Sequence, residues 1–188
     1  MRYERGFTLL EILVALVLIG LLAGVLVPTV TNQLSRGEAG RVAEDLGGIE
    51  AATKAFRVDV QRWPLHVRHL AVQPTAAAPD SVFGGGLYPA NLISRWRGPY
   101  LEKGSIPGDT LPTAAGGVIL GRFLPITWGA TSFISVRTKG ITQANARAVR
   151  LILDGDTAVG NTSSSASTIG RVRWLTGDTM IYLISPVQ

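Results

Sequence analysis

The sequence predicts an α+β protein in which a long N-terminal α-helix, half of it transmembrane, packs on a small C-terminal antiparallel β-sheet. Three observations lead to this class. The mean hydropathy of the 188 residues is +0.27, and only 16% of them are charged. Much of this apolar character lies in residues 12–27, which carry no polar side chain. Apolar residues then recur at helical spacing as far as Trp63, and β-branched residues cluster after Gly117. A helix followed by short strands is an α+β pattern.

Residues 7–30 predict a membrane-spanning helix. At 1.5 Å per residue they extend about 36 Å, which exceeds a hydrocarbon core of about 30 Å. Arg2 and Arg5 precede the segment, so the positive-inside rule places the short N-terminal head in the cytoplasm and the rest of the chain outside. A cleaved secretory signal peptide fits less well, because the apolar run is longer and lacks an Ala-x-Ala site. A plain anchor remains the alternative.

Glu11 distinguishes this segment from a plain anchor. A carboxylate at the bilayer centre costs about 2.5–3.5 kcal/mol, and such groups usually have a partner. Cleavage between Gly6 and Phe7 would create an α-amino group four residues before Glu11. Neutralisation of Glu11 by the amine of a neighbouring copy would then explain both features.

The run GFTLLE at residues 6–11, followed by the apolar segment and Pro28, resembles the class III signal of type IV pilins and type II secretion pseudopilins. The resemblance implies a pilin-like fold and cleavage by a prepilin peptidase after Gly6, which removes residues 1–6 as a leader. It further implies N-methylation of Phe7 and a role for Glu11 and Pro28 in residues 7–30, the transmembrane and assembly helix.

Residues 31–63 are predicted to form the amphipathic second half of the helix. Its apolar or near-apolar positions alternate at spacings of four and three residues. These positions are Val42, Leu46, Ile49, Thr53, Phe56, Val60 and Trp63. The mixed charges on the opposite side of the helix are typical of a solvated or subunit-facing surface. Pro64 ends the helix. Pro28 and several glycines predict a bend or local melting between residues 24 and 48. Melting near the equivalent proline is implied by the resemblance for filaments, and a simple kink is the alternative.

Residues 64–112 are rich in Pro, Gly and Ala and predict a long, partly ordered connecting region. Within it, WRGPYL at residues 96–101 resembles a motif of the major pseudopilin of type II secretion systems. The tract that commonly follows in that family is not adjacent, so a type IV pilin remains open.

Residues 113–188 are predicted to form the β-sheet domain. Strands are expected at 118–124 and 131–137 as one hairpin, and at 172–175 and 180–184 as a second. Thr142 is a candidate cap for a helix over 143–153, in which Ala144, Ala148, Leu151 and Ile152 fall at helical spacing.

Two groups of residues are candidate binding sites. Major pseudopilins bind calcium in a C-terminal loop, so Asp154 and Asp156, with Asp178 as a third ligand, are candidate Ca²⁺ ligands, although the spacing is not that of an EF-hand. A helix end followed by a solvated loop is the alternative. His66 and His69 would share a metal ion only on a helix and otherwise form a surface loop pair.

A run of basic residues raises the possibility of DNA binding. No acidic residue lies between Asp109 and Asp154, and an exposed positive patch attracts phosphates. The candidate residues are Arg122, Arg137, Lys139, Arg147 and Arg150.

The predicted function is that of a structural subunit. The chain has no cysteine and only two histidines, and it lacks a nucleophile elbow, a phosphate loop and an HExxH motif, so no enzyme activity and no obligatory cofactor are predicted. The resemblance implies a filament of a type II secretion system. Alternatives are a minor type IV pilin for adhesion, twitching or natural transformation, a DNA receptor at a pilus tip, and a membrane-anchored domain that does not polymerise.

The resemblance also implies partners and a location. The partners are further copies of the chain, other pilins or pseudopilins, the prepilin peptidase, an inner-membrane platform protein and an assembly ATPase. The location is the cytoplasmic (inner) membrane, crossed once, with the C-terminal domain in the periplasm or outside the cell.

Overall fold

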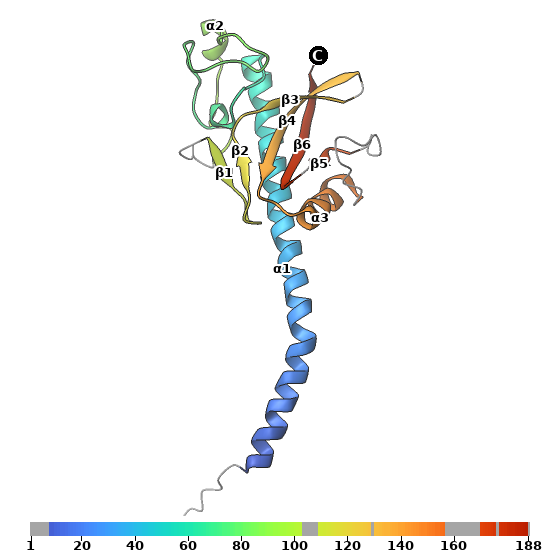
Figure 1. Cartoon of the computed structure of the whole chain (residues 1–188). Coiled ribbons are helices and arrows are strands. Elements are labelled where there is room, and N and C mark those ends of the chain that lie inside the picture. The colour runs from blue at the N-terminus through green and yellow to red at the C-terminus, as the bar shows by residue number, and fades with distance from the viewer. Residues whose placement is uncertain (1–7, 103–108, 129, 157–169, 176, 188) are drawn as a thin grey trace, which may run out of the picture. The chain divides into compact units, whose positions relative to one another are not determined.

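The computed structural model describes residues 8–102, 109–128, 130–156, 170–175 and 177–187 (Figure 1). The chain divides into two compact units, one ending at Gly37 and the other beginning at Glu38. The first unit contains the N-terminal part of helix α1 (Leu9–Val60). The second contains the remainder of α1, a six-stranded sheet and three short helices.

Helix α1 is continuous over 52 residues and passes through Pro28 and the glycines between residues 24 and 48. The expected local melting is therefore not present in this structure. A proline removes one backbone donor, and each glycine lowers helix stability by about 1 kcal/mol relative to alanine. The neighbouring intrahelical hydrogen bonds can offset these local losses. The hypothesis of melting in an assembled filament stays a prediction.

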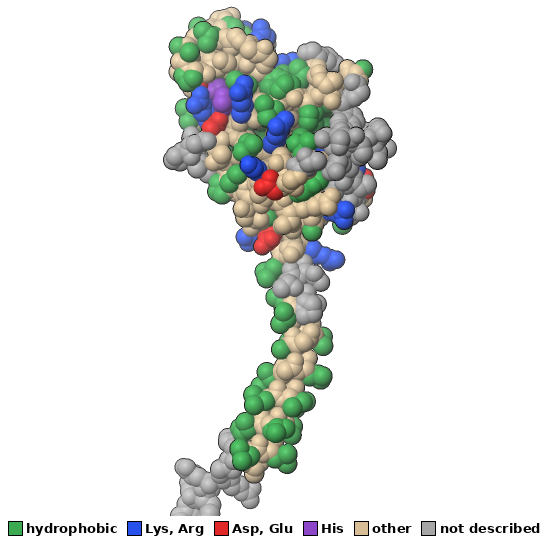
Figure 2. Space-filling view, viewed as in Figure 1, with side chains coloured by type: hydrophobic (Ala, Val, Ile, Leu, Met, Phe, Trp, Pro, Cys, Tyr) green, Lys and Arg blue, Asp and Glu red, His purple; other side chains and the backbone are tan. Residues whose placement is uncertain are grey.

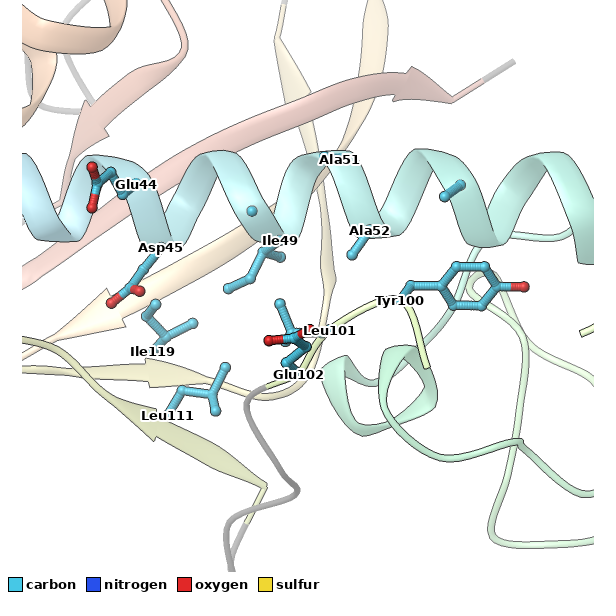
Figure 3. Close-up of a pocket in the computed structure, with 12 residues that line it drawn as sticks. Glu44, Asp45, Ile49, Ala51, Ala52, Tyr100, Leu101, Glu102, Leu111 and Ile119 are labelled. Atoms are coloured by element: carbon cyan, nitrogen blue, oxygen red, sulfur yellow. The ribbon is translucent and has the colours of Figure 1, made fainter. Parts of the chain in front are cut away.

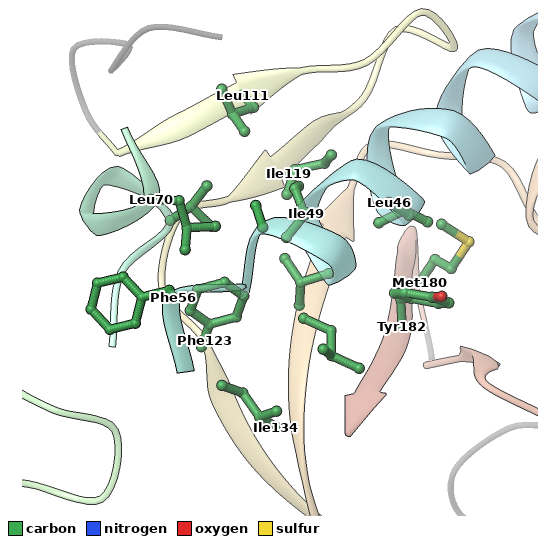
Figure 4. Packing of buried hydrophobic residues seen from close by; sticks show 14 of the residues in the cluster. Leu46, Ile49, Phe56, Leu70, Leu111, Ile119, Phe123, Ile134, Met180 and Tyr182 are labelled. Carbon is green, nitrogen blue, oxygen red and sulfur yellow. The ribbon is translucent and has the colours of Figure 1, made fainter. Parts of the chain in front are cut away.

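The predicted apolar stripe of α1 is part of the core of the second unit. Its positions from Val42 to Val60 are at most 1% exposed, including Thr53. Figure 4 shows Leu46, Ile49 and Phe56 packed among residues of the strands. The helix ends at Val60, because Gln61 adopts a φ of +56°. Trp63 is only partly buried, and the guanidinium carbon of Arg57 lies 4.7 Å from the centroid of its ring.

The sheet is antiparallel, with strand order β1-β2-β4-β6-β5 and with β3 paired to β4. The long strands β4 and β6 form its centre, and β5 and β6 form the predicted second hairpin. The strand bounds are β1 (Thr110–Pro112), β2 (Val118–Leu120), β3 (Leu124–Trp128), β4 (Thr131–Lys139), β5 (Val172–Trp174) and β6 (Thr179–Val187). The predicted fold class, a long helix packed on a small antiparallel sheet, is confirmed.

The single strand predicted over 118–124 is wrong, because the chain leaves the sheet at Gly121. A Cβ atom placed on Gly121 would lie 1.9 Å from the carbonyl oxygen of Asp109, so this close approach requires glycine. Arg122 then forms an isolated bridge with His66. The chain returns to the sheet as β3, which occupies part of the predicted turn.

The region from Pro64 to Pro112 is more ordered than predicted. It contains a 3₁₀ helix, η1 (Val67–Leu70), a short helix α2 (Ala90–Ile93), and strand β1 at its end. Leu70, Tyr88 and Ile93 are buried in the same core as α1. The ring of Phe56 makes edge contacts with Tyr88 and Tyr100, at centroid distances of 6.1 and 5.9 Å. The connecting region is therefore an integral part of the domain.

Helix α3 (Gln143–Asp154) forms where predicted. The Thr142 side chain accepts a hydrogen bond from the backbone N–H of Asn145 at 3.2 Å, and Gly155 closes the helix with a φ of +78°. Its orientation was not foreseen. Ala146 and Val149 are buried, whereas Leu151 and Ile152 are 53% and 54% exposed. Part of the apolar stripe in the sequence therefore faces solvent.

Replacing Thr142 with alanine should lower the free energy of unfolding by about 1 kcal/mol, because the N–H of Asn145 loses its acceptor. Chemical denaturation of the full chain in detergent, followed by near-UV circular dichroism, measures this loss. The control is Thr142→Asp, which keeps a capping oxygen and should retain most of the stability. Equal losses in the two variants would contradict a capping role.

Candidate functional site: the N-terminal apolar segment

The first part of α1 presents apolar side chains on all sides. Residues Leu9–Val27 have a mean hydropathy of 2.9, and none of them is buried. Among the described residues this is the one helix long and apolar enough to cross a membrane. Its large side chains are between 47% and 91% exposed, and Figure 2 shows hydrophobic side chains along this part of the chain. Burial of each would contribute about 1.5–3 kcal/mol, so covering the segment with lipid or protein is energetically favourable.

Thr8 and Glu11 define how this helix begins. The backbone N–H of Glu11 donates to Thr8 Oγ1 at 3.2 Å, and the N–H of Ile12 donates to the carbonyl oxygen of Thr8 at 3.3 Å. Thr8 is thus the N-cap and Glu11 the third helical residue, in the Thr-x-x-Glu pattern of a capping box. A carboxylate in the first turn is also favoured by the helix dipole. The Thr-x-x-Glu spacing at residues 8–11 is the sequence signal for this role of Thr8.

The structure describes only the backbone position of Pro28 among the other residues predicted for this site. Gly6 and Phe7, the predicted cleavage and methylation positions, lie outside the described residues. Pro28 lies within α1, but its side chain is outside the described part of the structure.

The three candidate metal ligands do not lie together. Asp154 accepts hydrogen bonds from the backbone N–H groups of Arg171 and Val172 at 2.7 and 2.8 Å. Asp156 pairs with the Arg150 guanidinium, and Asp178 lies in the turn between β5 and β6. Within the described residues, no three His, Asp or Glu side chains are placed to hold a metal ion. The loop of residues 161–168 lies outside them.

His66 and His69 are part of a hydrogen-bonded cluster rather than a surface pair. His69 is 2% exposed. Its Nδ1 lies 3.1 Å from the Tyr88 hydroxyl, and its Nε2 lies 3.0 Å from Asp80 Oδ1. Burial lowers the pKa of His69 to about 4, against the opposing effect of Asp80. His69 is therefore a neutral side chain that holds the connecting region in place, and His66 contacts Asp109.

The predicted nucleic-acid-binding residues lie on different elements. Arg137 and Lys139 belong to β4, Arg147 to α3, and Arg122 to the segment before β3. Arg150 is 1% exposed and is hydrogen-bonded to Asp156 and to the carbonyl oxygen of Val172. Arg150 therefore does not belong to any exposed basic patch, because its guanidinium is buried and hydrogen-bonded within the domain.

Glu50 lies on α1 and connects this helix to the sheet domain. Its Oε2 accepts hydrogen bonds from the Tyr182 hydroxyl and from Arg171 Nη1, the latter at 2.9 Å, and its Oε1 accepts one from Lys54 at 2.6 Å. Burial alone would raise the pKa of Glu50, but the hydrogen bonds from Lys54 and Tyr182 and the charge of Arg171 lower it below its ordinary value. Its partners in β6 and before β5 are more than 120 residues away, so no local pattern could have indicated this role.

The chain is similar to known proteins, and the similarity includes its N-terminal segment. Residues 1–27 match the family model of the prokaryotic N-terminal methylation motif. The type II secretion system core protein G of Aeromonas hydrophila is 31% identical over 103 residues, which are 53% of this chain and 72% of that protein. The core protein G of Klebsiella pneumoniae is 35% identical over 81 residues, or 43% of this chain, and there the match spans 56% of the relative.

A solved structure is also similar to this chain. The major type IV pilin PilA1 of Clostridium difficile aligns with 81% of this chain and 97% of its own, with a TM-score of 0.40 and 13% sequence identity.

Proposed function

The chain belongs to the family of type IV pilins and type II secretion pseudopilins, and we propose that it is a structural subunit of a type II secretion pseudopilus. The observation that supports this most directly is the apolar helix Leu9–Val27, none of which is buried, with Glu11 in its first turn, inside the matched methylation motif. The relatives named type II secretion system core protein G favour the secretion class.

The proposed mechanism is polymerisation. Before assembly, the apolar segment crosses the cytoplasmic membrane once, and the folded domain lies in the periplasm. A prepilin peptidase cleaves after Gly6 and methylates the new terminus at Phe7. During assembly the apolar segment leaves the lipid and packs against those of other copies, where van der Waals contacts replace lipid contacts. An assembly ATPase acting through a membrane platform protein supplies the work.

Glu11 sets the position of each new subunit in this mechanism. At membrane depth, an isolated carboxylate is costly. Pairing with the amine of Phe7 on a neighbouring copy neutralises both charges, and removing one partner leaves the other uncompensated. The pair forms at only one axial offset between neighbouring copies, so it determines the register of the subunits along the filament.

The test is the chemical identity of the N-terminus. The full chain, expressed in membranes with a prepilin peptidase, should yield a product that begins with N-methylated Phe7 by intact-mass and peptide analysis. Replacing Gly6 with valine should block this processing, whereas Gly24→Ala, within the same apolar segment, should leave it unchanged. A mature membrane protein that retains Met1 would contradict the proposal.

A further inference from the structure

We propose that neighbouring subunits of the filament are joined by a second contact, in which the exposed face of α3 from one copy occupies a groove beside α1 of the next copy. This contact lies between the folded domains and is separate from the packing of the N-terminal segments. It rests on the proposed function, because it requires that copies of the chain assemble.

The groove lies along the second half of α1, within the second unit. It has a volume of about 530 Å³ and extends from Glu44 to Ala55, which corresponds to about 17 Å of helix. Figure 3 shows its walls, formed by Tyr100 and Leu101 and by Leu111 and Ile119 of strands β1 and β2.

Small residues form the floor of this groove. Gly48, Ala51 and Ala55 are exposed and lie three or four residues apart on α1. A Cβ atom placed on Gly48 would meet no heavy atom within 4 Å. Small residues at this spacing allow another helix to approach the backbone closely. The groove is therefore shaped for a helix with larger apolar side chains.

Carboxylates at the groove select the charge of its occupant. Glu44 and Asp45 from α1 and Glu102 beyond Leu101 all line it. An occupant that fits must combine an apolar surface with a positive charge, because an apolar or acidic helix would leave Glu44 and Glu102 without compensation.

The outward face of α3 has this combination. Ala144, Arg147, Leu151 and Ile152 are exposed, and their spacing places them on one side of the helix. Arg147 lies within the apolar stripe and forms no ion pair with another described residue. An amphipathic helix that lays its apolar face in a groove is a common mode of recognition.

The two surfaces lie at opposite ends of the sheet, and this favours a second copy as the occupant. The groove adjoins β1 and β2, whereas α3 contacts β5 at the other end of the strand order (Figure 1). Two different surfaces of one chain that complement each other form a head-to-tail contact. Such a contact leaves one groove and one α3 free at the two ends, and it continues into an open filament when the rotation between copies does not close a ring.

Disulfide cross-linking tests this contact without background, because the chain has no cysteine. The variant combines Ala55→Cys on the groove floor with Ile152→Cys on α3, and filaments assembled by the full chain are oxidised in place. A disulfide requires Cα atoms about 4.4–6.8 Å apart. We expect a ladder of covalent multimers, with at least about tenfold more cross-linked chain than in the control, because the contact raises the local concentration of the two thiols.

The matched control combines Ala55→Cys with Leu87→Cys, since Leu87 is 53% exposed and lies in the connecting region. A charge test accompanies it: Arg147→Glu, added to the cross-linking pair, should reduce the ladder about tenfold through repulsion by the groove carboxylates, whereas Arg147→Lys should keep it.

Each outcome separates the two proposals. Filaments that form without the ladder, or with an equal ladder in the control, overturn the α3 contact and leave the proposed function standing. Loss of the ladder in Arg147→Lys as well as Arg147→Glu would also overturn it, because charge would not be the cause. A chain that forms no filaments in the presence of the complete assembly machinery contradicts both the proposed function and this contact.

Discussion

Replacing Glu11 with alanine should reduce the yield of filaments by at least about tenfold while leaving the chain inserted in the membrane. The carboxylate costs about 2.5–3.5 kcal/mol at membrane depth, so alanine favours insertion. Under the proposed mechanism, however, the methylated amine of Phe7 would lose its partner in the assembled state, and an uncompensated charge inside a filament core is strongly unfavourable. Filaments sheared from cells and quantified by immunoblot, together with the membrane fraction, measure the two effects separately.

The matched control for this prediction is Glu38→Ala, which removes a carboxylate of α1 beyond the apolar segment. It should keep the yield of the unmodified chain. If Glu11→Ala also kept the full yield, the role of Glu11 in setting the register would be refuted.

Replacing Phe56 with alanine should lower the free energy of unfolding by about 3–5 kcal/mol, the usual range for removing a fully buried aromatic side chain. Phe56 is 0% exposed and packs edge-on against Tyr88 and Tyr100. Its removal would leave a cavity between α1 and the connecting region. Denaturant unfolding of the full chain in detergent, followed by near-UV circular dichroism, measures the loss.

Val58 provides the comparison on the same helix, because it is 76% exposed. Val58→Ala should change the free energy of unfolding by no more than about 0.5 kcal/mol. Similar losses in both variants would mean that the buried stripe does not hold α1 on the sheet.

The parts of this fold that follow from local patterns could be predicted from the sequence. The stripe from Val42 to Val60 depends on helical periodicity, and the second hairpin depends on two short, largely apolar runs around a Thr-Gly-Asp-Thr turn. The apolar segment with Glu11 was predicted in the same way, since bilayer thickness and the cost of a buried charge act on a single contiguous stretch.

Features that depend on distant residues could not be predicted. The strand break at Gly121 is caused by the backbone of Asp109, and the burial of Arg150 depends on the carbonyl group of Val172. The orientation of α3 depends on its packing against β5, which turned Leu151 and Ile152 outward against the expectation from their apolar character.

The hydrogen bonds of Glu50 give the subunit a mechanical property. Apolar contacts along α1 resist separation from the sheet, but they have little preference against sliding along the helix axis, because one apolar neighbour replaces another. The bonds from Tyr182 and Arg171 to Glu50 are directional and stretch as soon as α1 shifts axially. If the chain assembles as proposed, these hydrogen bonds would transmit tension along α1 to the sheet, in a chain that has no cysteine to form a disulfide.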